Sequence, residues 1–544
     1  MRATPLYGLL LLAITLLIPS PARAFCGFYV SGADASLYNN ATLVVLMRDG
    51  TRTVLSMQNN YQGPPSDFAM VVPVPQVLKK ENVKTLPPDV FKHIDQLSAP
   101  RLVEYWEMDP CQDWAMPMMA MRGGADVVMA SGEVFDADKL GVKIEAQFSV
   151  AEYDIVILSA NDSAGLETWL KREKYNIPAG SGEVLKPYVA AGTKFFVARV
   201  DIKRVTYQDG AAVLSPLRVS YDSDTFSLPV RLGLLNSKGE QDLLVHILAS
   251  DRYEAANYKN AFIPTNLKVN EDVVDRFGPF YDSLFREVGT PGTVVTEYAW
   301  SAGSCDPCPS PPLDESEIAT LGGDVVGSLD PYSAVITRLH YRYTSASLGE
   351  DLVFKKANPV IGGRGLPDEQ GNISEKVAGE SGSNQFQGRY VMLHPWTEKI
   401  TCDAPHRGRW GGPDRMPAWA GGAGPIPRAE PSQLSAPSAT SKQPLHWSKG
   451  ITEDVPELGL VRAAAVVPTG APTPTGDSSM IPELGGGDPP KEAATPTPGG
   501  ADLPPADVSP QPAEERRCAT APGAVGWMGL LLAALAATRR RPQP

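Results

Sequence analysis

The chain has 544 residues, with 62 Asp and Glu residues against 49 Lys and Arg residues and a formal net charge of −13 at pH 7. This length allows several domains. The acidic balance, without a basic patch interleaved with aromatic residues, argues against nucleic acid as a partner.

Residues 1–24 have the three parts of an export signal: a positively charged start, the apolar core Leu9–Ile18 and an A-x-A motif that ends at Ala24. This pattern predicts that signal peptidase cleaves the chain and that the mature protein begins at Phe25. The nearby Cys26 suggests a lipoprotein signal as an alternative. Phe25 stands where such a signal needs a small residue, so ordinary cleavage is favoured.

Residues 25–402 are predicted to form a mixed α/β body. Three segments alternate apolar and polar residues with a period of two, which is typical of half-buried antiparallel strands. Ala41–Met47 and Leu243–Leu248 are denser apolar runs and resemble central strands. The alternating sets, each expected to face one way, are Val142, Ile144, Phe148 and Val150; Phe196, Ala198, Val200 and Ile202; and Val335, Leu339, Tyr341 and Tyr343.

Three longer segments have helical patterns. Pro88–Leu97 is followed by Pro100, and Ser163 is a plausible N-cap for a helix over Ala164–Lys174. Glu271–Val288 carries a stripe of apolar residues at helical spacing. Together with the strands, these helices predict an α+β fold, predominantly antiparallel β with several helices, in one large domain or two intimate ones.

Several motifs of this body resemble an exported bacterial family known only as domain of unknown function 2330. They are Ser66-Asp-Phe-Ala-Met-Val-Val-Pro-Val-Pro75, Leu158-Ser-Ala with Leu166-Glu-Thr-Trp-Leu170, Lys186-Pro-Tyr188, Leu214-Ser-Pro-Leu217 and Cys305-Asp-Pro-Cys308. The resemblance spans most of residues 25–345. It implies export and a shared fold, and it implies no particular activity.

The body contains five cysteines, and export would place them in an oxidising compartment. They are disulfide candidates, and an odd number leaves one unpaired or paired with another chain. The sequence leaves their connectivity open. The five residues are Cys26, Cys111, Cys305, Cys308 and Cys402.

Cys305 and Cys308, together with Cys402 and His406, also have the spacing of a zinc site. A structural disulfide is favoured over zinc, because the two halves lie far apart in the sequence and the compartment is oxidising. A thioredoxin-type redox pair is a third reading of the C-x-x-C motif. That role needs a helix that begins at the first cysteine, and the surrounding prolines oppose one.

Met116, Met118, Met119 and Met121 form a cluster of thioethers, which are soft ligands suited to Cu(I). An exported copper-binding loop is therefore one hypothesis. A pliable apolar loop that uses methionine as filler is favoured. With zinc and copper kept only as alternatives, we expect no resident cofactor.

Residues 403–517 are rich in Pro, Gly, Ala, Ser and Thr, a composition that buries too little apolar surface to form a core. We expect a disordered stalk. Residues 518–544 follow as a sorting tail, in which Cys518 precedes the apolar run Val525–Ala537, which is shorter than the ~20 residues of a comfortable membrane span.

The tail ends in a basic cluster, Arg539, Arg540 and Arg541, expected to remain on the cytoplasmic side of a membrane. The order of cysteine, short apolar span and arginines resembles the MYXO-CTERM tail of myxobacterial surface proteins. The resemblance implies cleavage near Cys518 by a sorting protease and anchoring through that cysteine.

No catalytic sequence motif occurs in the chain, and His93, His246, His340 and His394 lack partners at any recognisable spacing. The sequence therefore favours an exported protein of the cell envelope, anchored in the membrane or displayed at the surface. Its body is expected to be a non-catalytic binding or structural module whose partner is an envelope protein or a polysaccharide. The alternative is an exported metal-binding or thiol-redox domain that uses Cys305 and Cys308.

Overall fold

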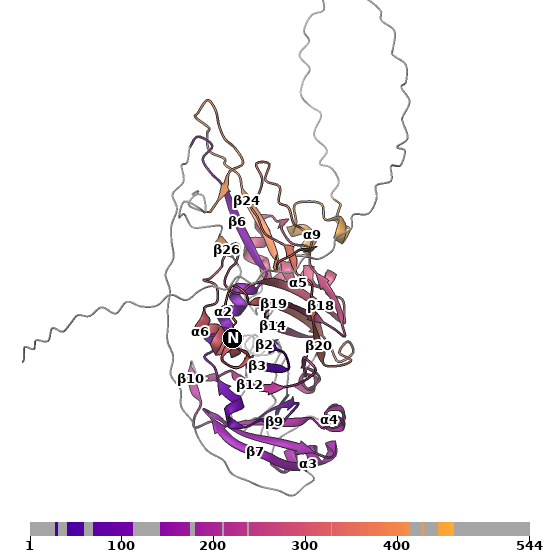
Figure 1. Ribbon diagram of the computed structural model, residues 1–544. Coiled ribbons are helices and arrows are strands. Elements are labelled where there is room, and N and C mark those ends of the chain that lie inside the picture. Colours follow the sequence, from indigo (N-terminus) through magenta and orange to yellow (C-terminus); the bar gives the residue numbers. More distant parts are fainter. Residues whose placement is uncertain are drawn as a thin grey trace, which may run out of the picture. The chain divides into compact units, whose positions relative to one another are not determined.

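The computed structural model describes residues 28–30, 41–58, 69–112, 142–173, 180–208, 211–236, 239–327, 329–412, 426–428 and 444–461. All of them belong to one unit, Met1–Ala465, and the second unit, Val466–Pro544, contains no described residue. Strands outnumber helices in the described ranges (Figure 1). This confirms the α+β class predicted from the sequence.

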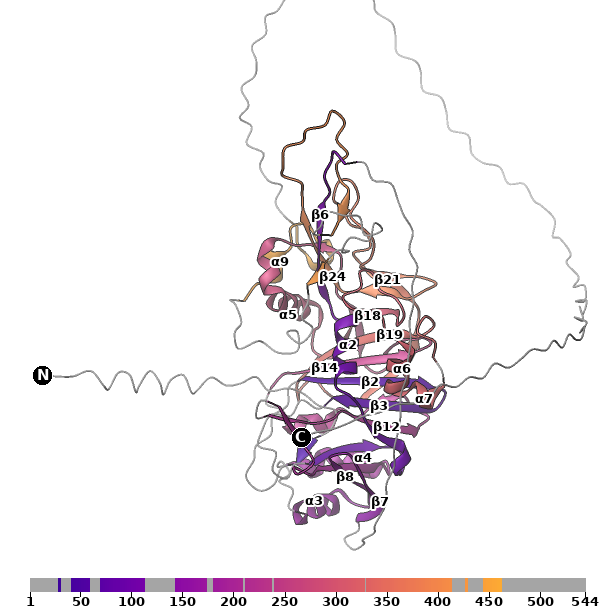
Figure 2. The same ribbon diagram turned by 90° about the vertical axis from the view of Figure 1, so that its left-hand side faces the viewer.

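The largest sheet has 11 strands, and β16 (Lys259–Phe262) pairs with β18 beside its main path. Figure 2 shows the middle of this sheet, from β18 down to β12. The main path runs β22 (Gly379–Glu380), β21 (Val360–Gly362), β23 (Gln385–Gln387), β18 (Thr293–Ser301), β19 (Val335–Tyr343), β14 (Gln241–Ala249), β2 (Ala41–Asp49), β3 (Arg52–Gln58), β12 (Leu217–Asp222) and β5 (Val83–Thr85).

The two dense apolar runs of the sequence lie side by side in this sheet. β2 and β14 pair in parallel, and β14 pairs with β19 in the antiparallel direction. Both faces of β2 are covered, because Val44 and Val45 belong to cores on opposite sides of the sheet. A strand buried on both faces needs a continuous apolar run, so the prediction of central strands is confirmed.

Two smaller sheets share the core on one face of the large sheet. Leu46 of β2, Phe196 of β9 and Phe354 of β20 meet in this core, so the three sheets pack face to face. The five-stranded sheet has the order β1 (Phe28–Val30), β4 (Ala69–Val74), β9 (Lys194–Val200), β8 (Tyr153–Ala160) and β7 (Val142–Val150); the three-stranded sheet has the order β13 (Ser227–Leu228), β20 (Leu352–Ala357) and β15 (Arg252–Ala255); β10 (Thr206–Gln208) and β11 (Ala211–Val213) form a separate pair.

Helices cover the outer faces of the sheets. Phe91 of α2 packs with Val45 on the second face of the large sheet, and Leu166 of α3 packs with Phe195 behind the five-stranded sheet. The helices are α2 (Asp89–Ser98), α3 (Ser163–Arg172), α4 (Ser181–Ala190), α5 (Phe277–Val288), α6 (Glu315–Ile318), α7 (Asp324–Val326) and α9 (Trp447–Gly450), with short turns η2 (Lys80–Asn82), η3 (Arg231–Asn236), η4 (Glu271–Arg276), η5 (Ala319–Gly323) and η7 (Pro456–Leu458).

Two details of the predicted helices differ from the structure. The N-cap of α3 is Asp162 rather than Ser163, because the Asp162 carboxylate accepts hydrogen bonds from the backbone N–H groups of Ala164 at 2.9 Å and Gly165 at 2.7 Å. The helix expected over Glu271–Val288 is divided into the 3₁₀ turn η4 and the α-helix α5.

The alternation predicted for β7 is wrong in one respect. Val142 and Ile144 pack into the core beneath α3 and α4, whereas Phe148 and Val150 pack into the core shared with the large sheet. The cause is a β-bulge, because the pairing of β7 with β8 shifts around Glu145. One extra residue reverses the faces of all later side chains, so the four residues do not face one way.

A further sheet joins distant parts of the chain, and Figures 1 and 2 both show its strands β6 and β24 side by side. These two strands are parallel. The sheet consists of β17 (Leu267–Lys268), β24 (Arg389–His394), β6 (Arg101–Glu107) and β25 (Trp410–Gly411), with β26 (Ile426–Arg428) also paired to β6.

The predicted boundary between body and stalk at residue 402 is corrected by the described residues that follow it. Trp410 pairs with β6, and Leu445, Trp447 and Ile451 are buried in the same core as Phe280 of α5. Residues 444–461 therefore belong to the body rather than to a stalk. Their large apolar side chains supply the burial that the surrounding Pro-rich composition lacks.

Candidate functional site

Strand β19 carries three cationic side chains on one face. Arg338, His340 and Arg342 alternate with Leu339 and Tyr341, which point into the core between the sheets. Only 0 %, 4 % and 9 % of the surfaces of Arg338, His340 and Arg342 are exposed. Burial of cations at this depth is tolerated only when they are paired, so the opposite elements must supply acceptors.

A β-bulge in the neighbouring strand β18 supplies the first acceptor. The pairing of β18 with β19 shifts between Thr296 and Tyr298, and Glu297 is the extra residue. Val295 lies opposite His340, and Tyr298 lies opposite Arg338. The bulge therefore allows both Glu297 and Tyr298 to face the cationic side of β19, which an uninterrupted strand would not permit.

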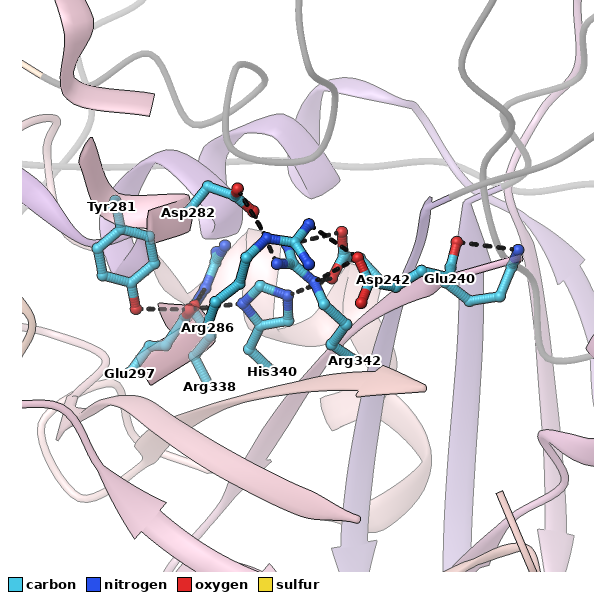
Figure 3. A network of polar contacts seen from close by, with 10 residues as sticks. Glu240, Asp242, Tyr281, Asp282, Arg286, Glu297, Arg338, His340 and Arg342 are labelled. Carbon is cyan, nitrogen blue, oxygen red and sulfur yellow. Dashed lines mark hydrogen bonds and ion pairs between the residues drawn. The ribbon is translucent and has the colours of Figure 1, made fainter. Parts of the chain in front are cut away.

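The carboxylate of Glu297 is the centre of a charged cluster (Figure 3). The charged cluster consists of Asp95, Glu240, Asp242, His246, Tyr281, Asp282, Arg286, Glu297, Arg338, His340 and Arg342. Arg338 Nε lies 2.7 Å from Oε2, while His340 Nδ1 and the hydroxyl of Tyr281 each lie 2.7 Å from Oε1. Burial raises the pKa of Glu297, but the charges of His340 and Arg338 outweigh this effect and hold the pKa at about 2. Glu297 is therefore ionised although its side chain is only 1 % exposed.

His340 is held between two carboxylates. Its Nδ1 faces Glu297, and its Nε2 lies 2.9 Å from Asp242 Oδ1. Ionised carboxylates only accept hydrogen bonds, so both ring nitrogens must donate and the ring is an imidazolium. Burial lowers the pKa of His340, but Glu297 and Asp242 outweigh it and the pKa is raised above 6.5. Neither nitrogen is left to take a proton from a substrate.

From Asp242 the charged cluster continues to the surface. Arg342 bonds Asp242 through Nε at 2.7 Å and Nη2 at 3.1 Å, and its Nη1 bonds Asp282 at 2.7 Å. Asp282 accepts from Arg286 Nε at 3.0 Å, and Arg286 Nη2 reaches Glu240 at 2.8 Å. These last two side chains are 52 % and 42 % exposed, so the cluster runs from the core to solvent.

At its inner end the charged cluster joins the sheet to α2. Arg338 Nη1 makes a short contact with Asp95 of α2 and lies 3.3 Å from His246 Nε2 on β14. A guanidinium can only donate, so this imidazole nitrogen is unprotonated. Burial and then the charge of Arg338 lower the pKa of His246 well below 6.5, and the ring is neutral.

The family model described as "Uncharacterized protein conserved in bacteria (DUF2330)" matches residues 20–355, which is more than half of the chain. The chain belongs to the DUF2330 family. Every residue of the charged cluster from Asp95 to Arg342 lies within the DUF2330 match. No curated protein matches the chain, and no solved structure does.

The histidines of the DUF2330 match, expected from the sequence to be isolated, have polar partners in the structure. Besides His246 and His340 in the charged cluster, His93 Nδ1 lies 2.5 Å from Glu317 Oε1. His394, beyond the match, lies 2.9 Å from Glu104. The detectable signal was the Arg-x-His-x-Arg alternation within a strand predicted to be half-buried, which requires buried acidic partners.

The cysteines of the described residues form two pairs. Cys111 is bonded to Cys402 with a Cα–Cα distance of 5.5 Å, and Cys305 to Cys308 with 4.9 Å. The four residues of the zinc hypothesis do not meet at one point: its three cysteines are divided between the two disulfides, and His406 is exposed. Within the described ranges, no group of three or more His, Cys, Asp or Glu residues is arranged to hold a metal ion.

The C-x-x-C loop of the DUF2330 match is attached to the core by its backbone. Arg101 Nη1 donates to the carbonyl of Pro307 at 3.2 Å, and the side-chain amide of Gln387 donates to the carbonyl of Asp306. The next helix, α6, begins only at Glu315, so Cys305 does not lie at a helix N-terminus.

Several residues of the predicted disulfide, copper and sorting sites lie outside the described residues. Among the residues that the structure does describe, no helix is long and apolar enough to cross a membrane. The predicted site residues outside the described ranges are Cys26, the methionines Met116, Met118, Met119 and Met121, and the sorting residues Cys518, Arg539, Arg540 and Arg541.

Proposed function

We propose that this protein is exported and anchored to the cell envelope, where its body acts as a non-catalytic binding or structural module. The export signal and the sorting tail of the sequence motivate the location. The observation that carries the non-catalytic role is the engagement of both His340 nitrogens by Glu297 and Asp242.

A general base must present a free nitrogen or oxygen to its substrate. In the charged cluster the groups with shifted pKa values bond one another instead, and the inner ones are almost completely buried. Structural ion-pair networks shift pKa values in the same way as active sites do. The cluster is therefore suited to fixing α2 and α5 on the large sheet.

The binding role is tested with the purified full chain and isolated envelope fractions. We expect the chain to sediment with envelope polymer or envelope protein without altering it, as followed by mass spectrometry of the soluble products. A heat-unfolded sample is the control. Turnover of any envelope polymer by the folded chain alone would overturn the non-catalytic proposal.

The anchoring role is tested by deleting residues 524–541, which include the apolar run and the arginine cluster. We expect the truncated protein in the medium, because only about 13 apolar residues and three arginines hold the tail at the membrane. Membrane fractionation followed by immunoblotting measures the distribution. Retention of the truncated protein in the membrane fraction would contradict the role of the tail.

A thiol-redox role is the second candidate, and the C-x-x-C disulfide favours it. Cys308 is exposed, so a reducing partner could reach its sulfur. Equilibration with glutathione buffers followed by alkylation and mass analysis measures its reduction potential. A potential below about −300 mV would mark the bond as structural and remove this candidate.

A further inference from the structure

A cavity of about 400 Å³ lies between the three-stranded sheet and the edge of the large sheet. Its wall is contributed by β15 and β20 on one side and by β16, β21 and β22 on the other. The size falls within the range of small-molecule sites, ~300–1,000 Å³. No residue of the charged cluster lines this cavity, so the two features are separate.

Arg252 is the most deeply buried charged residue in the wall, with 4 % of its surface exposed. Its Nε donates to the carbonyl of Asn358 at 2.7 Å, and its Nη2 lies 3.3 Å from Glu254 Oε2. Its Nη1 is buried and has no hydrogen-bond partner among the described residues. Buried donors of native proteins have partners, so this guanidinium calls for a further acceptor.

The charges around Arg252 favour an anion at this point. Glu254 is shared, because its other oxygen lies 3.3 Å from Lys355 Nζ. Two cations therefore depend on one carboxylate. Lys356, also in the wall, is paired with Asp251 at 2.6 Å. Arg252 therefore shares Glu254 with Lys355, and a ligand carboxylate would complete the pairing of its charge.

The remaining wall is partly apolar and partly acidic. Phe262 lies 5.7 Å from the Arg252 guanidinium carbon and packs edge-on against Phe386 at 4.9 Å. Val360 extends the apolar surface. Glu380 of the terminal strand β22 is exposed and lines the same cavity. An apolar group could therefore lie on Phe262 while a positive group is attracted to Glu380.

We propose that this cavity binds a small zwitterion, the chemistry that free amino acids share with short peptides. The carboxylate accepts from Arg252, the apolar side chain lies against Phe262, and the ammonium group faces Glu380. This inference rests on the proposed function, because it gives the binding role a location in the fold. It takes from that proposal that the bound molecule is not chemically altered.

Isothermal titration calorimetry with the full chain tests the proposal. The probes are leucine, leucyl-leucine, leucinamide, which lacks the carboxylate, and N-acetylleucine, which lacks the ammonium group. We expect binding of leucine or leucyl-leucine, and which of them binds more tightly identifies the source of the ligand. We expect leucinamide to bind at least about 10-fold more weakly, because it leaves the guanidinium without its acceptor.

The variant Glu380→Lys keeps the test independent of folding, because Glu380 is exposed at the edge of the sheet. It should weaken binding of the zwitterion by about 5-fold and strengthen binding of N-acetylleucine. Glu457→Lys makes the same change at another exposed glutamate, in η7; it is the matched control and should leave all affinities unchanged.

Two results overturn the proposal: no binding by any probe, or binding that neither amidation of the ligand nor Glu380→Lys alters. Release of leucine from leucyl-leucine would instead overturn the non-catalytic proposal and leave the binding site in place. Binding without turnover that depends on the carboxylate and on Glu380 supports both.

Discussion

At the scale of single residues, the stability of the charged cluster depends on Glu297. Its carboxylate compensates Arg338 and His340 and accepts from Tyr281. We expect Glu297→Gln to lower the free energy of unfolding by about 3–5 kcal/mol, because it leaves two buried cations underpaired. Glu240→Gln at the exposed end should cost no more than about 1 kcal/mol. Equal costs in urea unfolding would contradict the role of Glu297.

The pH dependence of stability follows from the pKa values of the same cluster. Glu297 has a pKa of about 2 against an ordinary value of 4.5, so its contribution is complete above pH 4.5 and is lost as the pH falls toward 2. The pKa of His340 is raised above 6.5, so its contribution is complete below pH 6.5 and is lost as the pH rises through the raised value.

We therefore expect the stability difference between the wild type and His340→Gln to be largest below pH 6.5 and to shrink above it. Urea unfolding between pH 5 and pH 9 measures this difference. His406→Gln removes an exposed histidine outside the charged cluster and controls for general effects. A difference that stays constant across this range would show that His340 is not stabilised as an imidazolium.

The sequence could not reveal this cluster at the residue scale. His340 bonds residues 43 and 98 positions away along the chain. No motif spacing connects such partners, because they meet only after the strands pair. The need for such partners could be read from the sequence, because Arg338, His340 and Arg342 alternate with Leu339 and Tyr341 along one strand.

At the scale of elements, dense apolar runs located β2 and β14, and helical patterns located α2 and α3, to within a few residues. In each case the burial of the element determines the pattern of its apolar residues. The same rule failed in β7, where the bulge at Glu145 reverses the faces. It also could not anticipate the bulge at Glu297, which aims the central carboxylate. A single inserted residue leaves no compositional trace.

Composition also hid the segment 444–461 within a Pro- and Gly-rich region. Trp447 is 5 % exposed and packs with α5. We expect Trp447→Ala to lower the free energy of unfolding by about 3–5 kcal/mol, the usual cost of removing a buried large side chain. Val461→Ala, at a residue that is 75 % exposed, should change it by less than about 0.5 kcal/mol. Equal effects in urea unfolding would place this segment outside the body.

At the scale of the whole molecule, the DUF2330 match ends at residue 355, whereas the described chain continues into β21 to β25, α9 and η7. These later elements do not form a separate core. β24 pairs with β6, which lies within the match, and Trp447 packs against α5, which also does. The disulfide between Cys111 and Cys402 links the match to the chain beyond it.

The two disulfides should therefore contribute unequally to stability. Cys111 and Cys402 are 291 positions apart, whereas Cys305 and Cys308 are 3 apart. In the chain-entropy model, closing the long loop stabilises the fold by about 6 kcal/mol and closing the short one by about 2 kcal/mol. We expect the double variant Cys111→Ala/Cys402→Ala to lose more stability in urea than Cys305→Ala/Cys308→Ala, each being the control for the other. The reverse order would mean that the C-x-x-C loop, attached through Arg101 and Gln387, stabilises the body more than the link between its two ends.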